Sequence, residues 1–539
     1  MDTFARLLLD RAGDDRTGLL FEDERYTWAD VLRQSRRRAA LAHALLGGDR
    51  PPHIGVLLDN VPEYLFWLGG AALAGSVLVG VNPTRRGAEL AHDVRHTDCR
   101  FIVTDTAHAP LLDGLDTGVP PERVLLVDGP AYAERLAATG PARAVEPSAR
   151  DPLLLLFTSG STGAPKAVVC GQGRLAAIGR QAPAFDITAG SVTYAAMPMF
   201  HGNTLMANIA LATAAGATIA LRRRFSASGF LPDIRRFGVT YFNYVGRALA
   251  YVLATPERDD DADNPLRVAF GTEASARDMA GFAERFGCRL IESYGSSEGA
   301  ISIRKTPDSP PDALGRPSGG ADVAVADPAT GEECPRARFG PDGRLRNPDE
   351  AIGEIVGRGV AFEGYYRNPA AEAERLRGGV FWSGDLGYRD ADGFFYFAGR
   401  AGDRLRVDGE NFAAAPVERI LSRWPSVVMC AVYPVPDPRT GDQVMAALEL
   451  DVPFAPEAFA RFLAEQPDLG TKWAPRFVRI VPSMPLTATN KVDKRPLHRE
   501  AWRGGEVWWR PGRDLRYEPL TGDARRSLEE QAAAHGRRI

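Results

Sequence analysis

A loop of nine small, hydroxyl or basic residues stands between two short apolar runs, and it constrains the fold of this chain more than any other feature. The runs at 153–157 and 167–170 are typical of buried strands. Between them lies Thr158-Ser159-Gly160-Ser161-Thr162-Gly163-Ala164-Pro165-Lys166. Small side chains let backbone N–H groups approach an anion closely, and the lysine adds positive charge. The segment predicts a phosphate-binding strand–loop–strand unit; the alternative is a glycine/serine hairpin turn without a ligand.

The loop is not a Walker loop, in which Gly-Lys-Ser/Thr opens a helix, because here a proline precedes the lysine and a strand-like run follows it. Its lysine is one of only five among 65 basic residues. Arginine therefore serves almost wherever a general positive charge suffices. A retained lysine is a candidate for a role that needs a compact charge on a flexible stem.

A second polar segment, Tyr294-Gly295-Ser296-Ser297-Glu298-Gly299, combines an aromatic face, hydroxyls and a carboxylate. Tyr294 suits a nucleotide base, Ser297 can donate to a phosphate, and Glu298 is a hard oxygen ligand suited to Mg²⁺. The same letters match Gly-x-Ser-x-Gly, the hydrolase nucleophile elbow, with Ser297 as nucleophile. That elbow needs a helix after the turn. The alternation at 300–304 favours a strand, and hence a nucleotide site.

Two further segments carry residues suited to a nucleotide. Asp385, in Trp382-Ser383-Gly384-Asp385, can accept two hydrogen bonds from a ribose diol, and Arg400 can brace the same sugar or a phosphate. Lys491, another of the five lysines, lies in the polar loop 485–494. Taken singly, the first segment is a common turn and Lys491 an exposed surface lysine. The functional interpretation depends on all four segments occurring together.

The chain has 539 residues, too many for one hydrophobic core, so we expect at least two domains. Helical patterns alternate with apolar runs from residue 17 to about 293, which predicts α/β architecture. Broken strand-like runs at 353–397 predict a small β-rich subdomain, and a compact α+β pattern follows a polar turn at 399–403. The fold class is thus α/β plus α+β: a layered N-terminal domain over 1–401 and a smaller, mobile C-terminal domain over 402–539. We assign no role to its Arg-rich tail.

Individual elements follow from the same patterns. Helices are expected at 27–46, 416–424 and 456–465, and strands at 53–58, 101–105, 427–434, 444–450 and 476–481. The most apolar stretch, 64–81, is short for a membrane span and contains four glycines, which favours a buried helix followed by a buried strand.

Charge and cysteine usage exclude several function classes. The net charge of −4 gives no electrostatic case for nucleic acid or an anionic membrane surface. The five cysteines have neither metal-ligand nor redox-pair spacing, and the first ten residues do not resemble a signal peptide. We expect a cytoplasmic protein without a membrane span or nucleic-acid partner; monomer and homodimer both stay open.

In this order and spacing, the four segments resemble the adenylate-forming superfamily of acyl-CoA synthetases, adenylation domains and firefly-type luciferases. The resemblance covers about 26–497. Residues 402–411, Gly-Asp-Arg-Leu-Arg-Val-Asp-Gly-Glu-Asn, are similar more narrowly to the fatty-acid-transport-protein and very-long-chain acyl-CoA synthetase branch. Through that resemblance, Gly409 joins the expected cofactor-binding residues.

The resemblance implies a nucleotide site built from all four motifs. The loop from Thr158 to Lys166 would hold the β- and γ-phosphates, Ser297 would contact the α-phosphate, and Glu298 would bind Mg²⁺. The ribose would lie at Asp385 and Arg400. The adenine would be flanked by Gly271, Thr272, Glu273, Ala274 and Tyr294, and Gly295 is a further expected cofactor-binding residue.

The resemblance also implies the catalytic groups, which would be Lys491, Glu298 and His201. His201, in Met-Pro-Met-Phe-His-Gly at 197–202, would lie near the acyl pocket. Lys491 would bridge the carboxylate and the α-phosphate, and Gly402 and Asp403 would form the hinge of the C-terminal domain. Related proteins usually carry Asp or Lys where Gly402 stands, so glycine here gives a more permissive hinge.

These observations predict an acyl-CoA synthetase that uses ATP, Mg²⁺ and coenzyme A. Its substrate would be an apolar carboxylic acid, fatty or bulky and cyclic, bound by parts of 197–212 and 241–251. An amino-acid substrate is disfavoured, because no Asp for its amine stands near His201. Two alternatives remain: transfer of the acyl group to a carrier protein or small nucleophile, and a binding or uptake module without turnover.

Overall fold

A computed structural model describes residues 2–47, 51–140, 142, 145–158, 166–246, 248–341, 343, 345–400, 404–407, 410–437, 442–470, 472–487, 491–512 and 514–534. The chain divides into two compact units. The first unit combines 1–272, 281–300 and 361–374, and the second combines 273–280, 301–360 and 375–539. The expected hinge, Gly402 and Asp403, lies outside the described residues, so a boundary at 401/402 stays a prediction.

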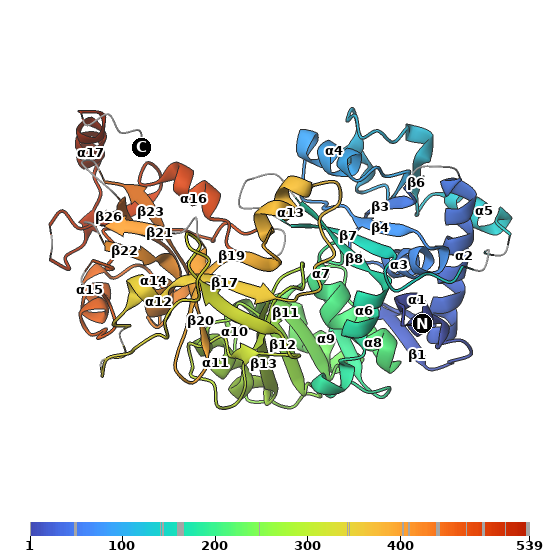
Figure 1. Ribbon diagram of the computed structural model, residues 1–539, viewed down its shortest axis with the longest axis horizontal. Helices are drawn as coiled ribbons and strands as arrows, with labels where there is room; N and C mark the ends of the chain where they lie inside the picture. Colours follow the sequence, from blue (N-terminus) through green and yellow to red (C-terminus); the bar gives the residue numbers. More distant parts are fainter. Residues whose placement is uncertain are drawn as a thin grey trace. The chain divides into compact units, whose positions relative to one another are not determined.

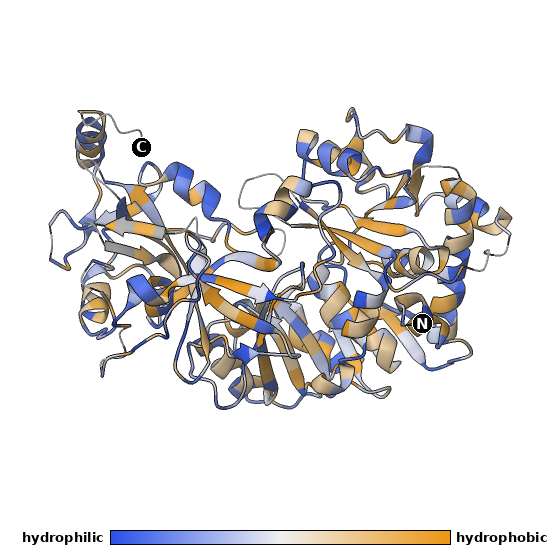
Figure 2. Cartoon of the chain, viewed as in Figure 1, coloured by the Kyte–Doolittle hydropathy of each residue, from blue (hydrophilic) through white to orange (hydrophobic). Residues whose placement is uncertain are grey.

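The first unit contains a six-stranded sheet with the order β6-β5-β3-β4-β7-β8, in which only the β7–β8 pair is antiparallel. Strands β3, β4 and β5 are buried at every position, as expected of parallel strands covered on both faces. Figure 2 shows the centre of this sheet as strongly hydrophobic. The strands are β3 (His53–Leu57), β4 (Val77–Gly80), β5 (Phe101–Thr104), β6 (Val124–Leu126), β7 (Pro152–Thr158) and β8 (Lys166–Gly171).

A second sheet of the same unit has the order β13-β12-β11-β9-β10-β1-β2. Its pairs are parallel except β1 with β2. Parallel strands end at one edge, so the segments that follow β11, β12 and β13 are brought together there. The strands are β1 (Thr17–Phe21), β2 (Glu24–Thr27), β9 (Val192–Ala195), β10 (Thr218–Leu221), β11 (Tyr241–Val245), β12 (Val268–Thr272) and β13 (Arg289–Gly295).

Helices connect these strands. Thr27 begins α2 with a reciprocal capping box to Asp30, which satisfies two backbone N–H groups at the helix start. Helices α1, α6 and α8 lie side by side (Figure 1). The bounds are α1 (Phe4–Leu9), α2 (Trp28–Leu46), α3 (Pro62–Ala74), α4 (Gly87–His96), α5 (Pro130–Ala138), α6 (Gln172–Gly179), α7 (Gly202–Thr204), a π-helical turn (Leu205–Ile209), α8 (Ala210–Ala215), α9 (Ala227–Phe237), α10 (Ala248–Leu253), α11 (Ala276–Phe286) and α13 (Pro369–Arg375).

The second unit begins with short antiparallel sheets, which confirms the expected β-rich subdomain. One has the order β16-β17-β19-β18, with β20 paired to β19, and two small pairs are β14–β15 and β21–β22. The bounds are β14 (Ser302–Arg304), β15 (Arg316–Pro317), β16 (Asp322–Ala326), α12 (Pro348–Ala351), β17 (Gly353–Arg358), β18 (Leu376–Arg377), β19 (Val380–Arg389), β20 (Phe395–Arg400), β21 (Arg404–Val407) and β22 (Glu410–Ala413).

Within its described residues, the C-terminal part of this unit forms a sheet with the order β23-β24-β25-β26-β27 and four helices. The tail without an assigned role belongs to this fold: Trp508 and Trp509 lie on β26, which pairs with β25, and α17 buries Leu528 and Ala532. The bounds are α14 (Ala414–Leu421), β23 (Val427–Pro436), β24 (Asp442–Leu450), α15 (Pro456–Ala464), β25 (Phe477–Ile480), α16 (Lys494–Glu500), β26 (Glu506–Trp509), β27 (Glu518–Pro519) and α17 (Gly522–Ala534).

The fold class and the individual elements are confirmed. The apolar stretch 64–81 forms most of α3 and then β4, as a buried helix and a buried strand. Among the helices of the described residues, none has the length and apolarity that crossing a bilayer requires.

Asp93 on α4 is a fully buried carboxyl whose pKa is raised to about 7, mainly because burial disfavours its charged form. Arg85 Nε lies 3.1 Å from Asp93 Oδ2. That oxygen has no hydrogen-bond partner within the described part of the chain, so the ion pair offsets only part of the burial cost. A carboxyl with a raised folded pKa leaves stability unchanged below its unfolded pKa of 3.8 and lowers stability as the pH rises towards 7.

We therefore expect Asp93→Asn to raise the free energy of unfolding at pH 8, by at most ~4 kcal/mol, and by less at pH 5. Urea unfolding of both proteins at the two pH values measures this difference. Asp116→Asn is the control, because Asp116 is an exposed partner of Arg95 and should show no comparable pH dependence. Equal or lower stability of Asp93→Asn at pH 8 would contradict the argument.

Candidate active site

Lys166 is the first residue of β8 and pairs across the sheet with Thr158, the last residue of β7. The intervening Ser159, Gly160, Ser161, Thr162 and Gly163, with 164–165, lie outside the described residues. The Lys166 side chain is only 5% exposed, and its Nζ lies 3.1 Å from Glu374 Oε2. A buried ammonium needs a counter-charge. Because Glu374 is 55% exposed, a phosphate can take its place beside the lysine.

Tyr365 connects Lys166 to Glu298. The Lys166 ammonium lies 5.5 Å from the centre of the Tyr365 ring. The Tyr365 hydroxyl donates to Glu298 Oε1 at 2.8 Å, and its backbone forms a bridge with Val168 on β8. The structure thus brings two expected site residues together through a third that sequence reasoning missed. Its only sequence signal is a glycine followed by two aromatic residues, in a segment without helix or strand period.

The turn that follows β13 carries Ser297 and Glu298. Arg174 donates to the Ser297 carbonyl at 2.5 Å. Gly299 has a φ of +65°, which favours glycine, and a β-carbon there would lie 2.2 Å from the Arg174 guanidinium, which would have to shift. After this turn the chain forms strand β14 without an intervening helix. The nucleophile-elbow alternative is therefore excluded, since its strand–turn–helix geometry is absent.

The loop that carries His201 lies beside this turn. His201 is half-buried and is the N-cap residue of α7. A β-carbon on Gly202 would lie 3.4 Å from Ser297 Oγ and 3.2 Å from Leu156 Cδ1 on β7. Segments that are distant in the sequence therefore meet at the carboxyl ends of β7 and β13.

The end of β12 has the close backbone approach expected of a base-binding segment. Gly271 lies flat against Tyr244, because a β-carbon there would be 2.4 Å from the tyrosine ring. The Tyr244 hydroxyl donates to Glu292 Oε2 at 2.6 Å, which holds that ring in place. Thr272 ends β12, and Tyr294 and Gly295 end the neighbouring β13.

In the second unit, Asp385 and Arg400 are direct cross-strand partners on β19 and β20. The Arg400 side chain is not among the described groups. Gly384, before Asp385, has a φ of +77°, which favours glycine at this position of β19. The sequence spacing of fifteen residues is thus the span of an antiparallel hairpin.

Two hydrogen bonds join Lys491 to Thr487: the Thr487 N–H donates to the Lys491 carbonyl at 2.7 Å, and the Lys491 N–H donates to the Thr487 hydroxyl at 3.2 Å. Its Nζ lies 2.6 Å from Glu273 Oε1. Glu273, which precedes Ala274, has a φ of +70°, a backbone conformation that residues other than glycine rarely adopt. The structure therefore joins two expected site residues, while Gly409 lies outside the described residues.

The carboxylate of Glu298 fits a Mg²⁺ that arrives with ATP. Mg²⁺ is usually held by one or two carboxylates together with phosphate oxygens and waters. Tyr365 donates to Glu298 Oε1 and leaves Oε2 for a cation. Among the described residues, no three acidic, histidine or cysteine side chains form a metal cage, so the donors present suit a phosphate-bound cation.

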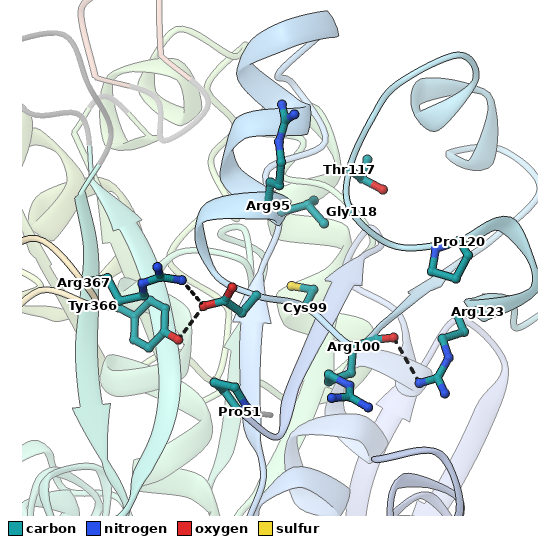
Figure 3. Close-up of a pocket in the computed structure, with 12 residues that line it drawn as sticks. Pro51, Arg95, Cys99, Arg100, Thr117, Gly118, Pro120, Arg123, Tyr366 and Arg367 are labelled. Atoms are coloured by element: carbon teal, nitrogen blue, oxygen red, sulfur yellow. Dashed lines mark hydrogen bonds and ion pairs between the residues drawn. The ribbon is translucent and has the colours of Figure 1, made fainter. Parts of the chain in front are cut away.

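A cavity of about 630 Å³ lies elsewhere in the first unit (Figure 3). Pro51, Arg100 and Pro120 precede β3, β5 and β6, so the cavity is at the amino ends of these strands, opposite to the edge where β7 leads into its loop. Asp98, which also lines the cavity, accepts from Tyr366 at 2.8 Å and pairs with Arg367 at 2.7 Å. None of the described residues that line the cavity is an expected site residue.

Comparison with known families decides the assignment. The profile described as "AMP-binding enzyme" matches residues 9–366, and the profile described as "AMP-binding enzyme C-terminal domain" matches 416–491. The chain belongs to the AMP-binding enzyme family. The expected adenylate-forming superfamily is thereby confirmed. The narrower fatty-acid-transport-protein branch stays a prediction.

Relatives of this AMP-binding enzyme include a protein named steroid-22-oyl-CoA synthetase from Rhodococcus jostii. It is 54% identical over 99% of this chain and 98% of its own length. Medium/long-chain-fatty-acid–CoA ligase FadD17 from Mycobacterium tuberculosis is 44% identical over 94% and 98%. The solved structure of anthranilate CoA ligase AuaEII with anthranoyl-AMP shares the fold, with a TM-score of 0.81, 22% identity, and coverage of 93% and 97%.

Proposed function

We propose that the chain is an ATP-dependent, AMP-forming carboxylate–CoA ligase for an apolar acid, and that a polycyclic acid of the steroid type is preferred over a straight fatty acid. The observation that carries this proposal is the 54% identity to a steroid-22-oyl-CoA synthetase along nearly the whole chain. The fatty-acid–CoA ligases stand at 44%. A cytoplasmic location goes with the proposal, because all five cysteines are free thiols.

In the first step of the proposed reaction, a substrate carboxylate oxygen attacks the α-phosphorus of ATP. A bond forms between that oxygen and phosphorus, and the bond to pyrophosphate breaks. Two anions must meet, so the barrier is largely electrostatic. Lys166 would neutralise the β- and γ-phosphates, and Lys491 would bridge the carboxylate and the α-phosphate. Mg²⁺ bound at Glu298 would offset phosphate charge.

In the second step, the coenzyme A sulfur attacks the acyl carbonyl carbon, a thioester forms, and AMP leaves. Lys491 would obstruct the thiol if it stayed beside the carboxylate. A C-terminal domain that turns on the expected hinge resolves this conflict, since different faces serve the two steps.

Pyrophosphate release tests the proposal. The purified chain is incubated with ATP, Mg²⁺ and one of several acids, with and without coenzyme A. We expect catalytic release with an apolar polycyclic acid only when coenzyme A is present, and slower turnover with fatty acids. Release at the same rate with and without coenzyme A would indicate that the acyl acceptor is a carrier protein or a small nucleophile. If no acid leads to pyrophosphate release, the result would support the alternative of a binding or uptake module without turnover.

A further inference from the structure

A chain of side-chain hydrogen bonds runs through the interior of the first unit, and the proposed mechanism does not use it. The Thr193 hydroxyl on β9 donates to Asn208 Oδ1 at 2.8 Å. Asn208 Nδ2 donates to Asn243 Oδ1 on β11 at 2.8 Å, and Asn243 Nδ2 donates to Asn203 Oδ1 on α7 at 2.7 Å. Thr193, Asn208 and Asn243 are fully buried, whereas Asn203 is half-buried.

This chain of hydrogen bonds has a direction. Each buried amide accepts on the side of Thr193 and donates on the side of Asn203. Asn203 therefore accepts through Oδ1, and its Nδ2 group, with two N–H donors, is left at the end of the chain. Within the described residues, Asn203 Nδ2 donates to no protein group. The buried amides thus orient one free donor.

The residue that carries the terminal donor belongs to a segment that contacts the candidate site. Asn203 directly follows Gly202, where a β-carbon would be 3.4 Å from Ser297 Oγ and 3.6 Å from Met206 Sδ. Asn208 belongs to the π-helical turn Leu205–Ile209, and such turns are frequent at functional sites. Asn203 also stands within 197–212, which is expected to line the acyl pocket.

An oriented donor in an apolar site affects selectivity. If the Asn203 amide turned over, its Nδ2 donor would face the Asn243 Nδ2 donor, so the hydrogen bond from Asn243 holds the Asn203 N–H group in one orientation. Burying a donor without an acceptor is unfavourable. A site built to donate to a substrate oxygen therefore rejects the analogue without that oxygen more strongly than an apolar pocket rejects a shorter chain.

We propose that Asn203 is the polar specificity residue of the acyl site and donates to an oxygen carried by the acyl group, outside the reacting carboxylate. This assignment of Asn203 rests on the proposed function. It narrows the substrate class to an apolar polycyclic acid with a hydroxyl or keto substituent. The donor suits a neutral oxygen, because the four linked side chains are all neutral and supply no charge for a carboxylate.

Matched acids test this proposal. Wild type and Asn203→Leu, which has similar size and no donor, are assayed with a polycyclic acid bearing a ring hydroxyl or keto group and with its deoxy counterpart. We expect wild type to favour the oxygenated acid at least ~10-fold in kcat/KM, which matches the loss of one hydrogen bond to a buried donor. In the variant this preference should vanish, through a raised KM for the oxygenated acid only.

The Thr193→Val variant tests whether the chain of hydrogen bonds orients the Asn203 amide. It removes the hydroxyl that begins the chain of hydrogen bonds, at a residue separated from Asn203 by two asparagines. We expect a partial loss of the preference with little change for the deoxy acid. Thr213→Val is the control, because the Thr213 hydroxyl is equally buried but donates to the Ile209 carbonyl at 2.7 Å, outside the chain.

Three results would overturn the proposal: a wild type that treats both acids alike, an Asn203→Leu variant that loses both equally, or a Thr213→Val variant that reproduces Thr193→Val. If neither acid supports pyrophosphate release, the proposed function fails instead. The increase in melting temperature caused by each acid, measured for wild type and Asn203→Leu, then tests the role of the Asn203 donor in binding without turnover. A preference for the oxygenated acid that disappears in the variant supports it, and equal stabilisation refutes it.

Discussion

Lys491→Ala is expected to lose formation of the acyl-adenylate while still converting supplied acyl-AMP and coenzyme A to the thioester. The lysine would serve only the first step, in which two anions meet. Removal of one positioned electrostatic group typically lowers kcat ~10²- to 10³-fold. Pyrophosphate release measures the first half-reaction, and AMP release from supplied acyl-AMP measures the second.

A matched control is Lys305→Ala in the same unit. Lys305 is half-buried and donates to the Pro311 carbonyl, and it is not among the expected site residues, so neither half-reaction should change. The Lys491→Ala variant removes the ion pair between Lys491 and Glu273. Both groups are partly exposed, so we expect no loss of folding. Equal loss of both half-reactions in Lys491→Ala would refute a role restricted to adenylation.

Glu298→Gln is expected to raise the Mg²⁺ concentration needed for half-maximal pyrophosphate release and to lower kcat, on the order of 10²-fold if the carboxylate is a direct ligand. The glutamine keeps an oxygen that can accept from the Tyr365 hydroxyl, so the contact across the site survives. Only the negative charge is removed. The measurement is a Mg²⁺ titration at saturating ATP and acid.

Tyr365→Phe separates the metal role from a structural one. It removes the hydroxyl that donates to Glu298 Oε1 but leaves the carboxylate free to bind a cation. We expect a smaller effect, within ~10-fold, with the Mg²⁺ requirement nearly unchanged. A Glu298→Gln variant with wild-type Mg²⁺ dependence would count against the metal assignment.

Local pattern was sufficient for most of the secondary structure. The run at 153–157 is confirmed as the centre of β7, because four consecutive leucines and a phenylalanine suit a strand covered on both faces. The helix expected at 27–46 begins at Trp28, since Thr27 caps it. In the C-terminal tail, Trp508 and Trp509 gave no such signal: each packs against residues distant in sequence, and pairing with β25 decides their strand.

The sequence by itself determined which chemical groups this protein offers: a hydroxyl-rich segment suited to phosphate, a carboxylate suited to a cation, and two scarce lysines in or beside polar segments. These properties depend only on residue type and order, so they can be recognised without a structure. Only the tertiary structure decided the partners: Tyr365 between Lys166 and Glu298, Glu273 beside Lys491, and three asparagines in one line of hydrogen bonds. Such contacts join residues far apart in sequence, and no local period records them, because packing of distant segments creates them.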